Sequence, residues 1–315
     1  MTGSERVIAV VGATATGKSV LAEALAPRLD AEVICADSRQ VFAELEIGTG
    51  KPSRADRAAR PHHLFDALRL GGHASAGWYA RAARDACEAV VARGRRPLLV
   101  GGSGLYLRAL RDGLAATPPH DLVVRDRLRQ ELESQGPQAL HVRLAAVDPA
   151  SAARLGTRDG QRISRALEVY EATGKPLSWW HARGPRPRSA DAWAVIEIVV
   201  PTAALRDRIA RRTAWMFAHG LVEETRSILA AGLGQALGAL HAIGYDEALD
   251  LIGGRLERAA AESLVNRRTA QLAKRQRTWF RHQMAAARIE GGHEAPEAVE
   301  RAALEALGAA GVAFR

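Results

Sequence analysis

A glycine-rich segment near the amino end constrains this chain more than any other feature. Residues 12–19 read GATATGKS and match the pattern G-x4-G-K-[ST]. The apolar, β-branched run at 6–11 predicts a buried strand before this segment, and the apolar spacing at 18–29 predicts a helix after it. A strand, a glycine-rich turn and a helix in this order predict a phosphate-binding loop.

The chemistry of such a loop follows from its backbone. The N–H groups turn toward the phosphate, and the N-terminus of the helix adds partial positive charge. Lys18 neutralises phosphate oxygens, and the Ser19 hydroxyl can hold Mg²⁺. A chance glycine-rich turn is the alternative, and the flanking strand and helix disfavour it. The predicted diphosphate- or nucleotide-binding residues are Gly12, Ala13, Thr14, Ala15, Thr16, Gly17, Lys18 and Ser19.

The rest of the chain extends this unit into an α/β fold. Further strands are predicted at 32–36, 97–100 and 193–200, with helices at 75–93 and 258–284. Strands alternating with helices predict a parallel sheet covered on both faces, similar to the P-loop NTPases. Gly12, Asp37 and Gly101 follow three of these strands, at the edge where such sheets bind ligands.

Residues 115–189 have a different character, with several prolines, short helical stretches and a Pro-, Gly- and Arg-rich loop at 183–188. We interpret this stretch as an all-helical insertion. Residues 1–114 then form the first part of the P-loop core, and residues 190–290 complete it with C-terminal helices. Residues 291–315 are predicted to be an Ala-rich tail.

Composition narrows the class of protein. There are 44 Lys and Arg against 35 Asp and Glu, a net charge of +9, which suggests a polyanionic partner. Only four of the basic residues are lysines, so part of this signal reflects a bias toward arginine. Cys35 and Cys87 are too few for a disulfide framework or a zinc cluster, which favours a reducing compartment. With no apolar run of about 18 residues and no signal-peptide pattern, we expect a soluble cytoplasmic protein.

The positions of the acidic residues indicate what the loop does with its phosphate. A kinase or hydrolase usually places an Asp at the end of a later strand to organise Mg²⁺. Here the strand at 97–100 ends in Gly101-Gly102-Ser103-Gly104, and the one acid at a predicted strand end is Asp37. The loop is therefore predicted to hold a leaving diphosphate rather than to split a nucleotide.

An ordered series of short motifs then becomes recognisable. They are DSRQVF at 37–42, GTGKPS at 48–53, HHLFD at 62–66, GGSGLY at 101–106, QRISRALEV at 161–169, TGKP at 173–176 and RQRTWFR at 275–281. The series spans about residues 6–283 and resembles the tRNA dimethylallyltransferases, which prenylate the adenosine just 3′ of the anticodon. Three positions depart from the family pattern: Ala13 replaces a Pro, Phe42 a Tyr and Ser103 a Thr.

The resemblance implies that the N6 amine of adenine attacks C1 of dimethylallyl diphosphate and that diphosphate leaves. It implies Mg²⁺ as cofactor and the tRNA anticodon stem-loop as partner. We also expect no membrane association and a monomer. Asp37 is the candidate general base; its alternative roles are to hold Mg²⁺ or to cap a helix. Lys18, Ser19 and Ser103 would face the leaving group. Arg212 matches the family's further cation best, with Arg208 as the alternative.

The same resemblance implies the tRNA contacts. Gln40 is the candidate reader of adenine N6 and N7, and its alternative is an ordinary surface residue. The full implied set is Asp37, Ser38, Arg39, Gln40, Ser103, Arg125, Gln161, Arg162, Ile163, Ser164 and Arg165. The basic run at 267–281, broken by Trp279 and Phe280, either binds RNA or is the solvated face of a helix that packs through Leu264, Leu272 and Trp279.

Two further motifs, and the function itself, allow more than one interpretation. His62, His63 and Asp66 suggest a metal site, but adjacent residues in an extended segment point apart, which favours a structural turn or a channel lining. Trp179 and Trp180 are predicted to pack at the base of the insertion. A small-molecule kinase and a non-catalytic RNA-binding module remain rival functions. The missing Mg²⁺-binding Asp and the large basic insertion count against the kinase, and the intact Lys18, Ser19 and Asp37 count against the binding module.

Overall fold

The computed structural model describes residues 6–118, 120–184, 193–292 and 295–314. The chain divides into two compact units, one made of Met1–Leu110 with Arg188–Arg315 and the other of Arg111–Pro187. We call them the sheet unit and the helical unit, and each is described by itself. Residues 185–188 of the predicted Arg-rich loop and the predicted boundary at 189–190 lie outside the described residues.

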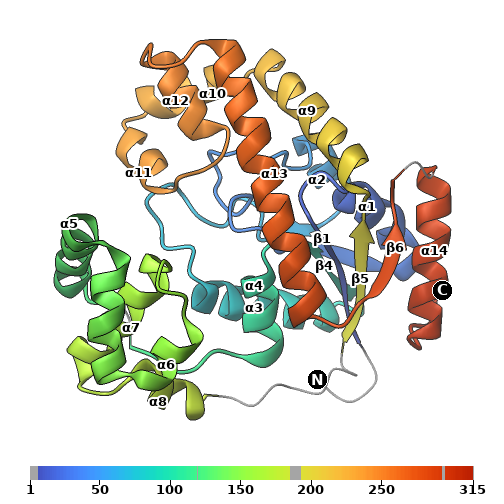
Figure 1. Cartoon of the computed structure of the whole chain (residues 1–315). Coiled ribbons are helices and arrows are strands. Elements are labelled where there is room, and N and C mark those ends of the chain that lie inside the picture. Colours follow the sequence, from blue (N-terminus) through green and yellow to red (C-terminus); the bar gives the residue numbers. More distant parts are fainter. Residues whose placement is uncertain (1–5, 119, 185–192, 293–294, 315) are drawn as a thin grey trace. The chain divides into compact units, whose positions relative to one another are not determined.

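The sheet unit is built on six parallel strands in the order β3-β2-β4-β1-β5-β6 (Figure 1). The central strand is β1, in which Val10 pairs with Val100 of β4 on one side and with Ile196 of β5 on the other. The strand bounds are β1 Val7–Gly12, β2 Ala31–Cys35, β3 His62–His63, β4 Arg96–Gly101, β5 Trp193–Val199 and β6 Ala287–Glu290. The predicted α/β fold with a parallel sheet is confirmed.

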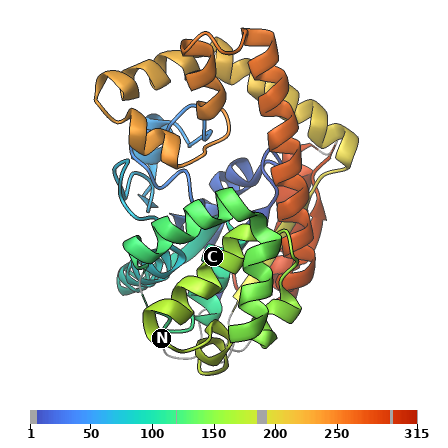
Figure 2. The same ribbon diagram turned by 60° about the vertical axis from the view of Figure 1, so that its left-hand side comes forward.

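Helices cover both faces because the central strands are apolar on both sides. On one face, α1 (Lys18–Leu29) and α14 (Pro296–Ala309) share an apolar cluster with Ile8 and Val10. On the other, α3 (Ala76–Ala92), α4 (Gly104–Asp112) and α13 (Arg258–Gln283) pack around Ala9, Val11 and Leu99. Helix α13 passes alongside the strands (Figure 2).

A third cluster in the sheet unit fixes the segment that follows β2. Helices α9 (Thr202–Ala218), α10 (Leu221–Ala230), α11 (Gly234–Ala239) and α12 (Tyr245–Ile252) contribute to it, together with Val41, Phe42 and Leu45. Phe42 is fully buried here, so this position makes an apolar contact in place of the hydroxyl that a Tyr would bring. The short helix α2 (Arg54–Ala59) lies farther along the same segment.

The helical unit contains α5 (Leu122–Val147), α6 (Pro149–Arg154), α7 (Gly160–Thr173) and α8 (Leu177–Ala182). Helix α5 is kinked at Gly136, where φ is 78°, because Pro137 cannot continue a regular helix. Leu128, Leu140 and Leu144 of α5 pack against Ile163 and Leu167 of α7. Trp179 and Trp180 meet edge to face in α8, and the Arg183 guanidinium lies 4.0 Å from the Trp179 ring centre.

The structure also contains elements that the sequence patterns did not predict. Strands β3 and β6 extend the two edges of the sheet, and the predicted tail contains α14, which packs on α1. Cys35 and Cys87 are buried free thiols, and burial raises the pKa of Cys87 to about 12. Among the described residues, no helix combines the length and apolar character that crossing a bilayer requires.

Candidate active site

The loop between β1 and α1 has the backbone that its sequence predicts. Gly12 has φ +143° and Gly17 has φ +95°, conformations that a side chain disfavours. A Cβ at Gly12 would also lie 2.7 Å from the Ile198 carbonyl oxygen, so β5 passes too close for any other residue. Ala15, at φ 62°, adopts the left-handed conformation without being glycine. The loop therefore curls tightly around the N-terminus of α1.

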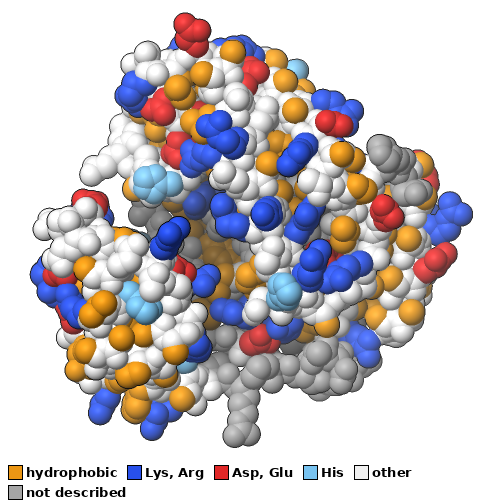
Figure 3. Space-filling view, in the orientation of Figure 1, with side chains coloured by type: hydrophobic (Ala, Val, Ile, Leu, Met, Phe, Trp, Pro, Cys, Tyr) orange, Lys and Arg blue, Asp and Glu red, His pale blue; other side chains and the backbone are white. Residues whose placement is uncertain are grey.

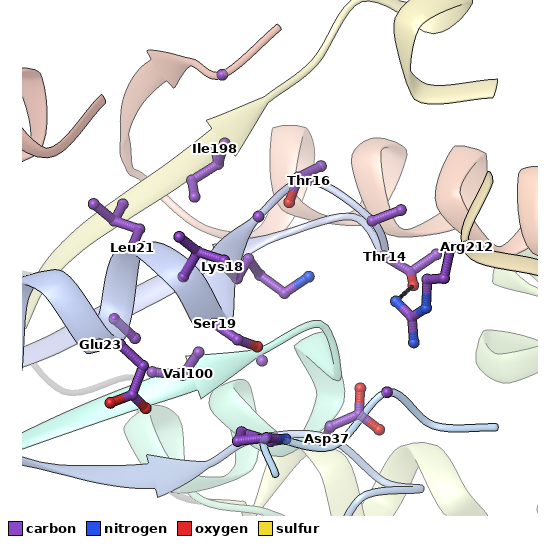
Figure 4. Close-up of a pocket in the computed structure, with 18 of the residues that line it drawn as sticks. Thr14, Thr16, Lys18, Ser19, Leu21, Glu23, Asp37, Val100, Ile198 and Arg212 are labelled. Carbon is purple, nitrogen blue, oxygen red and sulfur yellow. Dashed lines mark hydrogen bonds between the residues drawn. The ribbon is translucent and has the colours of Figure 1, made fainter. Parts of the chain in front are cut away.

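Lys18 lies inside this curl. Its Nζ donates to the Ala13 carbonyl over 2.6 Å, and the Thr16 hydroxyl donates to the same oxygen over 2.9 Å. Burial lowers the pKa of Lys18 to about 8, although the nearby Asp37 carboxylate partly raises it. At pH 7 the ammonium is therefore still charged. Ser19, one residue farther on, lines the same cavity (Figure 4).

Asp37 faces this loop from the end of β2 (Figure 4). Its Oδ1 accepts the N–H of Arg39 over 2.8 Å and the N–H of Gln40 over 3.4 Å, so this oxygen caps the turn that follows. No described residue donates a hydrogen bond to Oδ2. One carboxylate oxygen thus holds the turn, and the other is left to take a proton.

Arg212 reaches the cavity from α9. Its guanidinium donates to the Thr14 hydroxyl over 3.2 Å and to the Thr49 carbonyl over 2.8 Å. A Cβ at Gly50 would lie 2.4 Å from Arg212 Nη2, so a glycine lets the guanidinium pass. Burial lowers the pKa of Arg212, and Asp37 partly counters this effect. Arg208 also lines the cavity, but its guanidinium donates to the backbone carbonyls of Thr16 and Gly292.

The segment 101–104 after β4 is shaped by close packing. A Cβ at Gly101 would lie 2.1 Å from the Ala36 carbonyl oxygen, and one at Gly104 would lie 2.2 Å from the Trp279 ring. The Ser103 hydroxyl accepts the N–H of Ser38 over 2.9 Å and so holds the residue next to Asp37. Ser103 thereby joins the β4 and β2 ends of the site.

The remaining residues of the predicted DSRQ motif are held by protein contacts. The Gln40 amide nitrogen donates to the carbonyls of Thr49 and Gly50 over 3.1 and 3.2 Å, and its Oε1 accepts a long hydrogen bond from the Cys35 thiol over 3.9 Å. In this structure Oε1 keeps room for a second donor such as adenine N6–H, whereas Nε2 is already used by two carbonyls. Arg39 donates to the Leu240 carbonyl over 2.7 Å.

Lys18, Asp37, Gln40 and Arg212 line one cavity of about 950 Å³, and all of its lining residues belong to the sheet unit. Ser103 is not among these lining residues. Lys18 and Arg212 bring positive charge to the part of the cavity that Asp37 also faces (Figure 4). This arrangement suits an anion next to a proton acceptor.

The basic run lies on α13, where Lys and Arg side chains gather on the surface (Figure 3). Arg268 pairs with Asp246 and Glu247, and Arg277 donates to Thr202. Phe280 is buried in the core and Trp279 packs on Gly104, so both aromatic rings serve packing. The basic side chains that remain exposed are Arg267, Lys274, Arg275 and Arg281.

The two histidines at 62–63 have separate carboxylate partners. His62 lies 2.6 Å from Glu23, and His63 lies 2.6 Å from Glu32. Asp66 instead pairs with Lys51 and Arg57. Within the described ranges, no three His, Cys, Asp or Glu side chains gather as a metal site would require. The two histidines therefore have structural contacts, and they lie in strand β3 rather than in the predicted turn.

The predicted tRNA-contact residues of the helical unit lie on α5 and α7. Arg125, Gln161 and Arg162 are exposed. Ile163 is fully buried in the core of the unit, and the Ser164 hydroxyl is also buried. Arg165 donates to the Pro118 carbonyl and lies 2.9 Å from the buried Glu168.

Comparisons with known proteins agree with this geometry. The family model described as IPP transferase matches residues 40–283, and the one described as isopentenyl transferase matches residues 5–66. A tRNA dimethylallyltransferase of Salinispora tropica is 46% identical over 87% of this chain and 85% of its own. One of Salinibacter ruber is 42% identical over 88% of this chain and 86% of its own.

Solved structures give the same result. The tRNA isopentenylpyrophosphate transferase of Bacillus halodurans superposes with a TM-score of 0.68 at 30% identity, over 98% of both chains. A eukaryotic dimethylallyltransferase described as acting on tRNA shares the fold, with a TM-score of 0.76 at 24% identity, over 92% of this chain and 75% of its own. The matched residues cover most of the sequence, including the loop, Asp37 and Arg212, and this chain belongs to the IPP transferase family, whose curated members are tRNA dimethylallyltransferases.

Proposed function

We propose that this protein transfers a dimethylallyl group from dimethylallyl diphosphate to N6 of adenosine 37, next to the anticodon of tRNA. The products are N6-(dimethylallyl)adenosine and diphosphate. The observation that carries this proposal is the placement of two cations, Lys18 and Arg212, and one carboxylate, Asp37, around a single cavity in a member of this family.

The cations serve the leaving group. As the bond between C1 and the diphosphate oxygen breaks, its electron pair passes to the diphosphate, and negative charge grows there. Lys18 Nζ, the loop N–H groups and the Arg212 guanidinium line the space that receives this charge. Interactions that strengthen as charge develops lower the barrier, and one well-placed donor contributes about 3 kcal/mol.

Asp37 serves the nucleophile. The exocyclic amine of adenine is weak because its lone pair is delocalised into the ring. As the new bond between N6 and C1 forms, one amine proton passes to Oδ2 of Asp37. Oδ1 remains bound to the turn, so the carboxylate is oriented before the base arrives. General-base help of this kind is worth about 10²–10⁴-fold.

The site also suits a magnesium ion. The Ser19 hydroxyl and the free Asp37 oxygen are hard oxygen donors, and Mg²⁺ prefers few protein ligands together with phosphate and water oxygens. When bound, the ion would neutralise diphosphate oxygens. Ser19 is the residue that would hold it, with Asp37 reserved for the amine proton.

The RNA would be held by positively charged surface. On the sheet unit the exposed residues Arg267, Lys274, Arg275 and Arg281 present charge that no described acidic side chain pairs. On the helical unit, Arg125 and Arg162 are exposed. Such residues bind the phosphate backbone without reading sequence. The target adenine must leave the loop stack to reach a cavity as deep as this one.

Incubation of the purified protein with Mg²⁺, labelled dimethylallyl diphosphate and tRNA tests the proposal. Nuclease digestion should yield labelled N6-(dimethylallyl)adenosine. A tRNA carrying guanosine at position 37 is the matched control and should remain unlabelled. Turnover of ATP with a small hydroxylated acceptor, without labelled tRNA, would instead identify a kinase.

A further inference from the structure

We propose that Gln276 of α13 is a positioning residue that holds the diphosphate loop against the segment carrying Ser103. This inference deepens the proposed function, because it concerns the same diphosphate site. Gln276 carries no charge and belongs to a helix that provides none of the groups discussed above for the chemistry. It nevertheless lines the cavity.

Both the oxygen and the nitrogen of the Gln276 carboxamide make hydrogen bonds. The N–H of Thr14, in the loop, donates to its Oε1 over 2.8 Å. Its Nε2 donates to the carbonyl of Gly102 over 3.0 Å. A single half-buried side chain therefore joins two segments that the chain separates by 88 residues (102 − 14).

The partner segment is shaped to receive this amide. A Cβ at Gly102 would lie 2.4 Å from Gln276 Nε2, so only a glycine lets the side chain reach the carbonyl. The next turn of α13 approaches equally closely, because Trp279 packs where a Cβ at Gly104 would lie. Helix α13 is thus docked on the 101–104 segment through two side chains, of which Gln276 alone continues to the diphosphate loop.

This contact links the loop that faces the diphosphate to the segment that holds Asp37. The Ser103 hydroxyl, next to Gly102, holds Ser38 beside the general base. Thr14, at the other end of the amide, is also bound by Arg212. Removal of the amide leaves every charged group in place but frees Thr14 N–H and lets the loop move relative to Asp37. The expected effect is weaker diphosphate binding without a change in the net charge of the site.

The direct test is the affinity for inorganic diphosphate, measured by titration calorimetry with Mg²⁺. Gln276→Ala should raise the Kd about tenfold, because the loop is no longer held by the amide and must be ordered when diphosphate binds. The KM for dimethylallyl diphosphate should rise by a similar factor, and the KM for tRNA should not change. Gln271→Ala, the same change at an exposed position of α13, is the control and should match the wild type.

A second variant approaches the amide from its partner. Gly102→Ala should displace the Gln276 amide and raise the diphosphate Kd severalfold, whereas the double variant should be no weaker than Gln276→Ala alone. An unchanged Kd in Gln276→Ala, or effects that multiply in the double variant, would overturn the proposal. Diphosphate binding is measured without tRNA, so a failure of the wild type to label tRNA would contradict the proposed function and not this assignment.

Discussion

Replacing Asp37 by Asn separates the two roles of this side chain, which are to cap the turn after β2 and to accept the amine proton. Asn keeps the Oδ1 acceptor for the N–H groups of Arg39 and Gln40, so the turn after β2 stays capped. It loses the negative Oδ2 that takes the amine proton. Only the chemistry should therefore suffer.

The magnitude follows from the two roles. Loss of general-base help should lower kcat by about 10²–10⁴, which is about 3–5 kcal/mol in the barrier at 1.36 kcal/mol per tenfold. Stability should change by less than about 1 kcal/mol, because the cap remains. Asp37→Ala loses the cap as well and should cost about 1–2 kcal/mol more in the free energy of unfolding. Affinity for diphosphate should rise in Asp37→Asn, since a negative charge facing the anion is removed.

Single-turnover transfer to an anticodon stem-loop, thermal unfolding and diphosphate titration measure the three quantities. The tRNA affinity of Asp37→Asn should equal that of the wild type. A transfer rate within fivefold of the wild type would refute the role of Asp37 as the base. Equal loss of rate and of tRNA affinity would instead place Asp37 in RNA binding.

Three further predictions concern the charged groups. Burial lowers the pKa of Lys18 to about 8. We therefore expect kcat/KM for dimethylallyl diphosphate to fall about tenfold per pH unit above pH 8, as the ammonium deprotonates. A pH profile that is flat to pH 10 would contradict this. Arg212→Gln should raise the diphosphate Kd about 10²-fold, whereas Arg208→Gln should mainly lower the melting temperature, and calorimetry with thermal unfolding should separate the two. The tRNA affinity should fall steeply with salt, and Lys274→Ala with Arg275→Ala should reduce the slope of log K against log salt by about two; an unchanged slope would remove α13 from the RNA surface.

The features of the fold that sequence predicts are those with a strong local pattern. β1, the glycine-rich loop and α1 follow one another within 29 residues, and each has a distinct composition. The buried strands β2, β4 and β5 are continuous apolar runs because helices cover both faces. Such runs can be recognised as strands without knowing which strands pair with them.

The missed elements have weak patterns for physical reasons. In β6 only Ile289 is buried, and a four-residue edge strand gives little periodicity. Strand β3 has only two residues and is defined by its pairing with β2, so it has no sequence pattern of its own. Helix α14 is rich in alanine, so its buried and exposed faces differ little in hydrophobicity, although Ala303 and Leu307 pack in the core.

The candidate site likewise contains residues that the sequence locates and residues whose contacts it does not reveal. The loop residues and Asp37 stand next to recognisable strands, so sequence locates them. The partners of Gln276 are 262 and 174 residues away, and a lone glutamine in a helix carries no local signal of either contact. The burial of Ile163 likewise depends on packing of α7 against α5, which its own short motif does not reveal.

The position of α14 on α1 has a consequence for synthesis on the ribosome. The helix that bears Lys18 and Ser19 is made long before α14, whose residues cover its outer face. The helical unit is different, because α5–α8 are contiguous in the chain and pack on one another. The helical unit can therefore consolidate as soon as α8 is made, whereas the sheet unit gains the layer formed by α14 only after residue 309 has emerged.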